Sequence, residues 1–191
     1  PLEARSITIS RAKFSIDYPA SFMLIAAMNP CPCGYYNHPE KECICGAPVV
    51  QRYLSKISGP LLDRIDLHVE VTPIEFAELT STRTAERSQD IRRRVMETRK
   101  IQEKRFLGND YVYCNAQMSS KTVRELCTIE EQGKQLLKNA MERLNLSARA
   151  YDRILKVART IADMEASAMI LNQHLAEAIQ FRSLDRENWA G

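Results

Sequence analysis

The stretch Met23–Gly34, MLIAAMNPCPCG, joins an apolar run to a set of polar and cysteine residues. Residues 22–28 are continuously apolar, which predicts a strand buried on both faces, as in a parallel sheet. The run ends at Asn29, and open α/β sheets bind their ligands at the carboxyl ends of their strands. We therefore predict that Asn29 is a site residue.

Alternating apolar residues predict further strands on both sides of this run. Residues 6–10 and 13–17 carry an apolar side chain at every second position around a turn at residues 11–12, which predicts a β-hairpin. Residues 65–71 alternate in the same way and are closed by Pro73, so they predict a strand with one wetter face. The polar positions of that strand are Asp66, His68 and Glu70.

The second half of the chain has helical periodicity. Ser147 is suited to cap a helix whose apolar residues recur at steps of three and four. The same spacing runs through residues 133–144, and a third helix is expected over residues 170–181. These helices predict a small bundle.

Composition indicates a folded, globular protein. The chain has 191 residues, of which 45% are hydrophobic and 27% charged, enough to bury a core in one or two domains. A Ser- and Thr-rich link at residues 78–84 predicts two domains, 1–80 and 81–191. The predicted fold class is α+β, with a hairpin and two sheet strands before the helical bundle. We see no membrane span and no signal peptide, so we expect no membrane partner and a cytoplasmic location.

Positive charge is concentrated in residues 81–107, which contain nine basic and four acidic residues. This segment includes the stretch from Arg83 to Arg105, and its net charge of +5 exceeds the +3 of the whole chain. One interpretation is a solvated helical face with ion pairs between successive turns. The other is a surface that binds phosphates.

Four cysteines form two C-x-C pairs in the loop at residues 31–46. They are Cys31, Cys33, Cys43 and Cys45. Four thiolates on two turns can hold one tetrahedral Zn²⁺, and a glycine after each pair lets the backbone fold around the sulfurs. Disulfides and metal-free thiols are the alternatives, and His38 could replace one ligand. A zinc ion with four protein ligands would be structural, because no position is left for water.

Two arginines occupy positions with a functional and a structural interpretation. Arg64 precedes the third predicted strand, where it could form an ion pair with Asp63 or Asp66, or serve as an arginine finger. Arg149 lies in the first turn of the helix capped by Ser147, where the helix dipole disfavours a cation. Such a break of a local rule is typical of a functional residue. Arg153, one turn later, is a further candidate of the same type.

Three stretches together resemble one known family. They are AAMNPCPCGYY at residues 26–36, QRYLSKISGPLLDRIDLHVEV at 51–71 and LSARAYDRILKVARTIAD at 146–163. In content and order they are similar to the magnesium-chelatase-like AAA+ ATPases of the ComM/YifB group, which are associated with natural competence. The resemblance covers nearly the whole chain. It implies a partial AAA+ core followed by a helical lid.

The resemblance also implies an activity and roles for particular residues. It implies a hexameric ring that hydrolyses ATP with Mg²⁺ and acts on DNA, as a helicase in branch migration during natural transformation. Asn29 matches sensor 1, which orients the attacking water, and Arg64 matches the finger that reaches the neighbouring subunit's ATP. Arg149 matches sensor 2, a contact to the phosphates in its own subunit, with Arg153 as a second cofactor-binding candidate.

The first hairpin resembles a pore hairpin of related helicases, whose basic tip meets DNA. Arg11 matches that tip, with Lys13 as the second choice. Contacts of this kind go to phosphates, so we expect DNA binding that weakens with salt and shows little sequence preference.

No phosphate-binding loop of the form G-x-x-x-x-G-K-[ST] occurs in the sequence. The opening PLE resembles the family's sequence after the Walker B strand, so we expect both Walker motifs upstream of this chain. We therefore expect the chain alone to lack ATPase activity, and the sheet to lack strands, so that its first strand is exposed or covered by a partner chain. Two alternatives remain: a zinc-containing module that binds nucleic acid or protein without an ATPase role, and an ATPase subunit of a magnesium chelatase.

Overall fold

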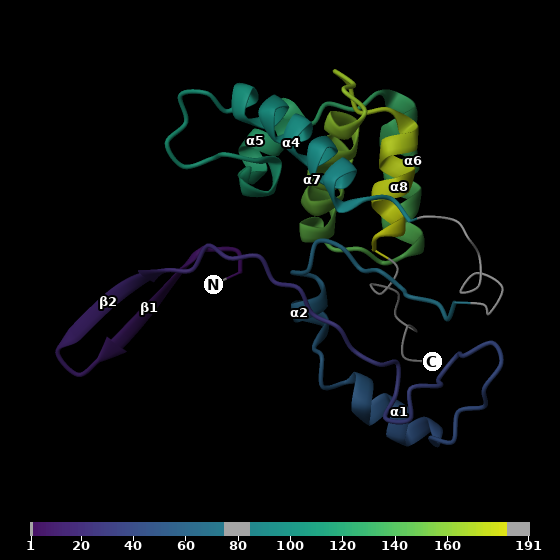
Figure 1. The fold of residues 1–191 in the computed structure, drawn as a ribbon. Helices are drawn as coiled ribbons and strands as arrows, with labels where there is room; N and C mark the ends of the chain where they lie inside the picture. The colour runs from purple at the N-terminus through teal and green to yellow at the C-terminus, as the bar shows by residue number, and fades with distance from the viewer. Residues whose placement is uncertain (1, 75–84, 183–191) are drawn as a thin grey trace. The chain divides into compact units, whose positions relative to one another are not determined.

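A computed structural model describes residues 2–74 and 85–182 (Figure 1). These residues form two compact units that meet in the sequence between Arg64 and Ile65, and each unit is described by itself. The described residues contain one two-stranded sheet, seven α-helices and a short 3-10 helix. This content confirms the α+β class. The predicted boundary at residues 80–81 and its link lie outside the described residues.

The first unit opens with the predicted hairpin. Strands β1 (Ser6–Arg11) and β2 (Phe14–Pro19) pair antiparallel, and Arg11 faces Phe14. The turn therefore lies at residues 12–13, one position later than predicted, and Ala12 takes a left-handed φ of 45°. One face of the ribbon is apolar and the other polar, because side chains alternate along each strand. The apolar face consists of Ile7, Ile9, Phe14, Ile16 and Tyr18, all exposed.

The strand predicted over residues 22–28 is wrong. Residues 20–29 have no regular secondary structure, and the apolar side chains of residues 22–28 are exposed, with Met23 at 82% and Ile25 at 81%. A strand needs a neighbour for its backbone hydrogen bonds. Within the described residues, the only strand pairing is that of β1 with β2. An apolar run without a neighbouring strand stays irregular.

The strand predicted over residues 65–71 is also wrong, and its burial does not follow the predicted alternation. His68, expected on the wetter face, is only 5% exposed, whereas Val71 is 87% exposed. The His68 N–H donates to the Phe181 carbonyl at 2.8 Å. The segment is therefore held by the end of the helical bundle and not by a sheet. For this reason the alternation of apolar and polar residues does not predict which of its side chains are buried.

Two helices complete the first unit. Helix α1 (Ala47–Leu54) begins after the cysteine loop, and the short helix α2 (Gly59–Leu62) ends just before Arg64. The buried apolar side chains among the described residues of this unit are Cys31, Val50, Leu54 and Leu62. The apolar core of this unit is therefore small.

The second unit is a helical bundle built around α7. Its elements are α4 (Ser88–Arg105), η1 (Asn115–Gln117), α5 (Ser120–Leu126), α6 (Glu131–Arg143), α7 (Ala148–Met164) and α8 (Asn172–Gln180). Helix α7 contacts α4, α5, η1 and α8, and α6 lies beside α8 (Figure 1). The three predicted helices are confirmed as α6, α7 and α8. Ser147 is the cap of α7, and its Oγ accepts the Ala150 N–H at 3.2 Å.

The apolar stripes of these helices form one core. Its fully buried members include Val123, Leu137, Ile154, Leu155, Ala158 and Leu175. No helix in residues 2–74 or 85–182 combines the length and the apolar character that crossing a bilayer requires.

Gly133 lies where α6 packs against α8. A Cβ atom at this position would lie 2.8 Å from Leu175 Cδ1 and 3.3 Å from Asn172 Oδ1. We expect Gly133→Ala to destabilise the second unit by about 1–2 kcal/mol, since overpacking outweighs the gain in helix propensity. Urea unfolding followed by circular dichroism measures this. Lys138→Ala on the exposed side of α6 is the control, and equal stability of both variants would contradict the prediction.

Candidate functional site

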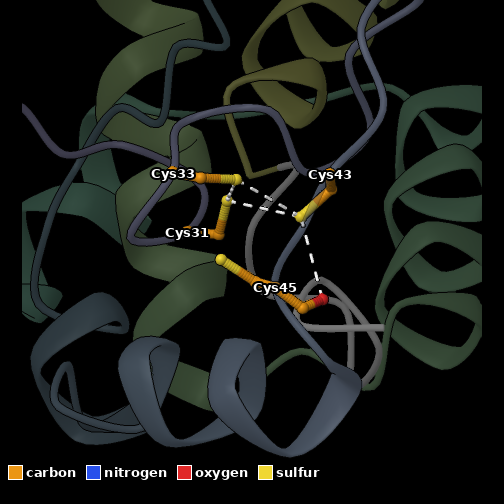
Figure 2. A group of neighbouring side chains, drawn as sticks. All are labelled: Cys31, Cys33, Cys43 and Cys45. Carbon is orange, nitrogen blue, oxygen red and sulfur yellow. Dashed lines mark hydrogen bonds between the residues drawn. The ribbon is translucent and has the colours of Figure 1, made fainter.

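The four cysteines of the first unit bring their sulfurs together, and Figure 2 shows the side chains turned toward one another. All four sulfurs lie within 4.8 Å of one another. Cys31 Sγ is 3.3 Å from Cys33 Sγ and 3.7 Å from Cys43 Sγ. A tetrahedral zinc ion with its usual Zn–S bonds holds sulfurs about 3.8 Å apart. Donor type, number and spacing therefore fit a structural Zn²⁺ site, whose fourth ligand is Cys45.

The backbone turns differently at the two pairs. Gly34 has φ of +83°, and its N–H donates to the Cys31 carbonyl at 3.0 Å. This tight turn confirms the role predicted for the first glycine, because only a residue without Cβ adopts that φ at no cost. Gly46 has an ordinary φ of −63° and is the N-cap of α1. The role predicted for the second glycine is therefore wrong, since the start of a helix follows Cys45.

His38 lies outside the ligand set. Its Nδ1 accepts the N–H groups of Glu40 and Lys41, each at 3.1 Å, and its ring meets Tyr35 edge-on with 5.6 Å between the ring centroids. These contacts order the loop between the two pairs. The disulfide alternative also fails within the cluster, because the shortest sulfur–sulfur distance of 3.3 Å far exceeds a bond length of about 2 Å.

The thiols of the cluster ionise unequally. A backbone hydrogen bond from Tyr35, helped by one from the Cys31 side chain, outweighs desolvation and lowers the pKa of Cys33 to about 6. A backbone hydrogen bond at Cys45 lowers the pKa of Cys43, but desolvation and the neighbouring sulfurs outweigh it and raise the pKa to about 12. Ionisation of one thiol therefore disfavours ionisation of its neighbour. A divalent cation would offset this repulsion.

Asn29 and Arg64 both lie in the first unit. Asn29 is exposed and stands just before the first cysteine pair. The Arg64 Nε donates to Glu3 at 3.2 Å, and its NH1 donates to the Pro60 carbonyl at 2.7 Å. The predicted pairing of Arg64 with a neighbouring aspartate is wrong. Glu3 replaces Asp63 and Asp66 because the fold brings the start of the chain to the end of α2.

Arg149 and Arg153 both lie on α7 in the second unit. Arg149 is exposed in the first turn. The Arg153 side chain is only 14% exposed, and its NH1 donates to the Asp66 carboxylate. The structure thus brings the four cysteines together, whereas the meeting of Asn29, Arg64 and Arg149 around one ligand stays a prediction.

The basic residues singled out for nucleic acid lie on two elements. Arg11 ends β1 and Lys13 lies in the turn, and both are exposed. The other basic residues of the segment lie on α4, apart from Arg87, which is its N-cap, and Arg83, which lies outside the described residues. Arg93 pairs with Asp90 at 3.1 Å and Arg94 pairs with Glu86 at 3.0 Å, so part of this charge is compensated. DNA contact by either element stays a prediction.

Sequence reasoning missed a buried ionic network in the second unit. Asp163 is 2% exposed and accepts hydrogen bonds from Arg105 NH1 at 2.6 Å, Asn115 Nδ2 at 2.8 Å and Arg159 Nε at 3.1 Å. The network joins the end of α4 to the end of α7. One signal was available, because Asp163 lies next to the apolar stripe of α7, where a carboxylate needs partners.

Electrostatics keep this network charged. Burial by itself raises the pKa of Asp163, but the hydrogen bonds from Arg105 and Asn115 and the charges of both arginines outweigh it, so the pKa is lowered. The hydrogen bond to Asp163 likewise raises the pKa of Arg105 against the effect of burial. Asp163 is therefore a carboxylate enclosed by two guanidinium groups.

Comparison with known proteins matches both parts of the chain to magnesium chelatase. The family described as "Magnesium chelatase, subunit ChlI" matches residues 1–79, and the family described as "Magnesium chelatase, subunit ChlI C-terminal" matches residues 85–182. These matches define the class of protein.

Individual relatives show which group within this class the chain resembles. Competence protein ComM of Haemophilus influenzae is 41% identical over 187 residues, which is 97% of this chain and 35% of that protein. The uncharacterized protein YifB of Escherichia coli is 40% identical over 187 residues, which is 97% of this chain and 36% of that protein. The chain belongs to the magnesium-chelatase-like family of ComM and YifB, which confirms the resemblance of the three sequence stretches.

A more distant relative extends the comparison. An uncharacterized protein of Mycobacterium bovis is 35% identical over 182 residues, which is 95% of this chain and 35% of that protein. The chain thus spans about a third of the length of the curated relatives it matches.

Proposed function

We propose that this chain supplies the sensor, arginine-finger and lid residues of a hexameric AAA+ ATPase that acts on DNA. The observation that carries the proposal is the family membership of both parts. The roles of Asn29, Arg64 and Arg149 are those that the sequence resemblance implies. Competence protein ComM is a relative at 41% identity, which supports a role in competence. Within that role we propose branch migration during natural transformation, as the sequence resemblance implies.

The surroundings of Arg64 suit an arginine finger. Its side chain is about one-third exposed and pairs with Glu3, whose side chain is 40% exposed. A surface ion pair of this kind is worth at most about 1 kcal/mol, so phosphate oxygens can replace the carboxylate. The hydrogen bond to the Pro60 carbonyl keeps the guanidinium oriented before it meets a neighbour's phosphates. Less conformational entropy is then lost when it binds them.

The proposed chemistry divides the work among three groups. The Asn29 amide orients the water that attacks the γ-phosphate. Arg64 stabilises the charge that develops on the transferred group, and Arg149 contacts the phosphates in its own subunit. When Mg²⁺ and ATP are bound, they supply the phosphoryl group and its charge neutralisation. The loop that cradles the phosphates is absent from the 191 residues, so we propose that turnover requires the full-length protein.

Two further parts serve the motor in this proposal. The four cysteines hold a structural Zn²⁺ that shapes the loop directly after Asn29. The exposed hairpin tip with Arg11 and Lys13 contacts DNA phosphates in the ring.

Arg64→Ala in the full-length protein tests the proposal. We expect ATP turnover to fall by at least about a hundredfold, since arginine fingers supply a large part of the rate. Nucleotide binding and ring assembly should remain. Arg64→Lys should not rescue turnover, because a point charge lacks the planar fork of guanidinium.

Arg52→Ala is the matched control, because Arg52 is an exposed arginine on α1 in the same unit. Its turnover should equal that of the wild type. If Arg64→Ala leaves hydrolysis unchanged while DNA binding is lost, the chain is a binding module and the ATPase proposal fails. Insertion of Mg²⁺ into a porphyrin by the wild type would instead support the magnesium chelatase alternative.

A further inference from the structure

The residues that directly follow Arg64 are fastened to the helical unit. Three hydrogen bonds do this: from Arg182 NH1 to the Ile65 carbonyl, from Arg153 NH1 to the Asp66 carboxylate, and from the His68 N–H to the Phe181 carbonyl. The segment has no regular secondary structure, so these bonds fix its path.

The one bond of the three that joins two side chains comes from the helix that also carries Arg149. Arg153 lies one helical turn after Arg149 on α7. At its other end, α7 is joined to α4 by the buried network around Asp163. Helix α7 therefore carries Arg149 near its start, the Asp66 contact one turn further on and the Asp163 network near its other end.

We propose that the Asp66–Arg153 pair is a latch that ties the position of the Arg64 finger to helix α7. The inference rests on the proposed function, in which Arg64 serves a neighbour's ATP and Arg149 serves its own. Two residues of extended chain reach about 7 Å at most, so the Arg64 backbone always lies near Asp66, and a closed latch ties Asp66 to α7. Nucleotide contact at Arg149 then biases the finger that the same subunit presents to its neighbour.

The pair is expected to contribute little to folding stability but much to the rate of ATP turnover, which distinguishes this role from a purely structural one. The Arg153 side chain is only 14% exposed, but the Asp66 side chain is 52% exposed, so the pair is partly solvated and contributes less to folding than a fully buried pair. Loss of the latch should thus leave the bundle folded. A reacting group displaced by about 1 Å can nevertheless cost two orders of magnitude in rate. Arg153 acts here as a positioning residue through Asp66, and not as a phosphate ligand.

Asp66→Asn in the full-length protein tests the latch. We expect kcat to fall by about tenfold while KM for ATP stays within about twofold, since the finger acts on the transition state and not on substrate binding. The exchange Asp66→Arg with Arg153→Asp should restore at least half of the lost rate. Asp90→Asn, which removes an Asp–Arg pair on the surface of α4, should change nothing.

A measurement without nucleotide checks the latch directly. Amide hydrogen exchange at His68 should become about tenfold faster in Asp66→Asn, because one of the three anchors is gone. Exchange in the core of α7 should stay as in the wild type. Unchanged exchange at His68 would overturn the latch.

Mixed rings identify which site the latch serves. Asp66→Asn subunits keep the residues of their own ATP site, and Arg149→Ala subunits keep a correctly placed finger. Where such subunits are neighbours, one ATP site is complete, so turnover of the mixture should exceed the average of the two variants. Mixing Asp66→Asn with Arg64→Ala should give no such gain, because both lack a placed finger. The opposite pattern would show that the latch serves Arg149, which overturns the inference. Full turnover by Arg64→Ala would instead defeat the proposed function, whereas full turnover by Asp66→Asn alone would defeat only the latch.

Discussion

Replacing both Cys33 and Cys43 with serine is expected to abolish zinc binding and unfold the first unit. A structural zinc site contributes an apparent free energy of about 10–16 kcal/mol at neutral pH, and where the apo site does not persist this becomes folding free energy. Little else holds the first unit together, because Cys31 itself is one of its few buried apolar side chains. Units of this size need a staple of some kind. Elemental analysis should find one zinc per wild-type chain and none in the double variant.

Amide NMR signals report the fold of each unit separately. Val50 and Leu54 report the first unit, and their dispersed signals should collapse in the double variant and in wild-type protein treated with a chelator. Added zinc should restore them in the wild type only. Cys114→Ser, a half-buried cysteine of the second unit, is the control and should keep both metal and signals. A wild-type chain that is folded and free of zinc would rule out this prediction.

Asp163→Ala is expected to destabilise the second unit by about 3–5 kcal/mol. The substitution leaves two guanidinium groups, those of Arg105 and Arg159, without the carboxylate that both contact. It also removes the acceptor of the Asn115 amide and the bridge from α4 to α7. Urea unfolding followed at 222 nm measures the loss, because the helices of the bundle dominate that signal.

The same network predicts a dependence on pH. The pKa of Asp163 is lowered in the folded state, so its contribution is complete above the unfolded value of about 3.9 and is lost as the pH falls through the folded value. The stability difference between wild type and Asp163→Asn should therefore be constant near neutral pH and shrink in acid. Asp90→Ala, which breaks a surface pair, should cost at most about 1 kcal/mol at any pH. A difference that grows in acid would contradict the assignment.

Elements that depend on near neighbours in the chain were predicted well. Helices α6, α7 and α8 and the Ser147 cap follow from spacings of three and four residues. The hairpin follows from two alternating runs around a short turn, with an error of one residue in the turn. Local pattern was sufficient here because each of these elements makes its backbone hydrogen bonds within itself.

The predicted strands failed for the opposite reason. Residues 22–28 have the composition of a central strand, but pairing depends on another strand beside them. Residues 65–71 alternate correctly, yet His68 is buried because Phe181 and Arg182 reach this segment from the end of the bundle. Sequence periodicity carries no information about such a distant partner.

The candidate sites also differ in whether their partners are near or far apart in the chain. The number and spacing of the four cysteines were enough to predict that their sulfurs lie together, because two short C-x-C turns leave the thiols few directions in which to point. The partners of the charged residues were not predictable in this way. Glu3 on Arg64, Asp66 on Arg153 and Arg105 on Asp163 are pairs of residues far apart in the chain. Coulombic attraction has no sequence period, so folding alone selects which charges meet.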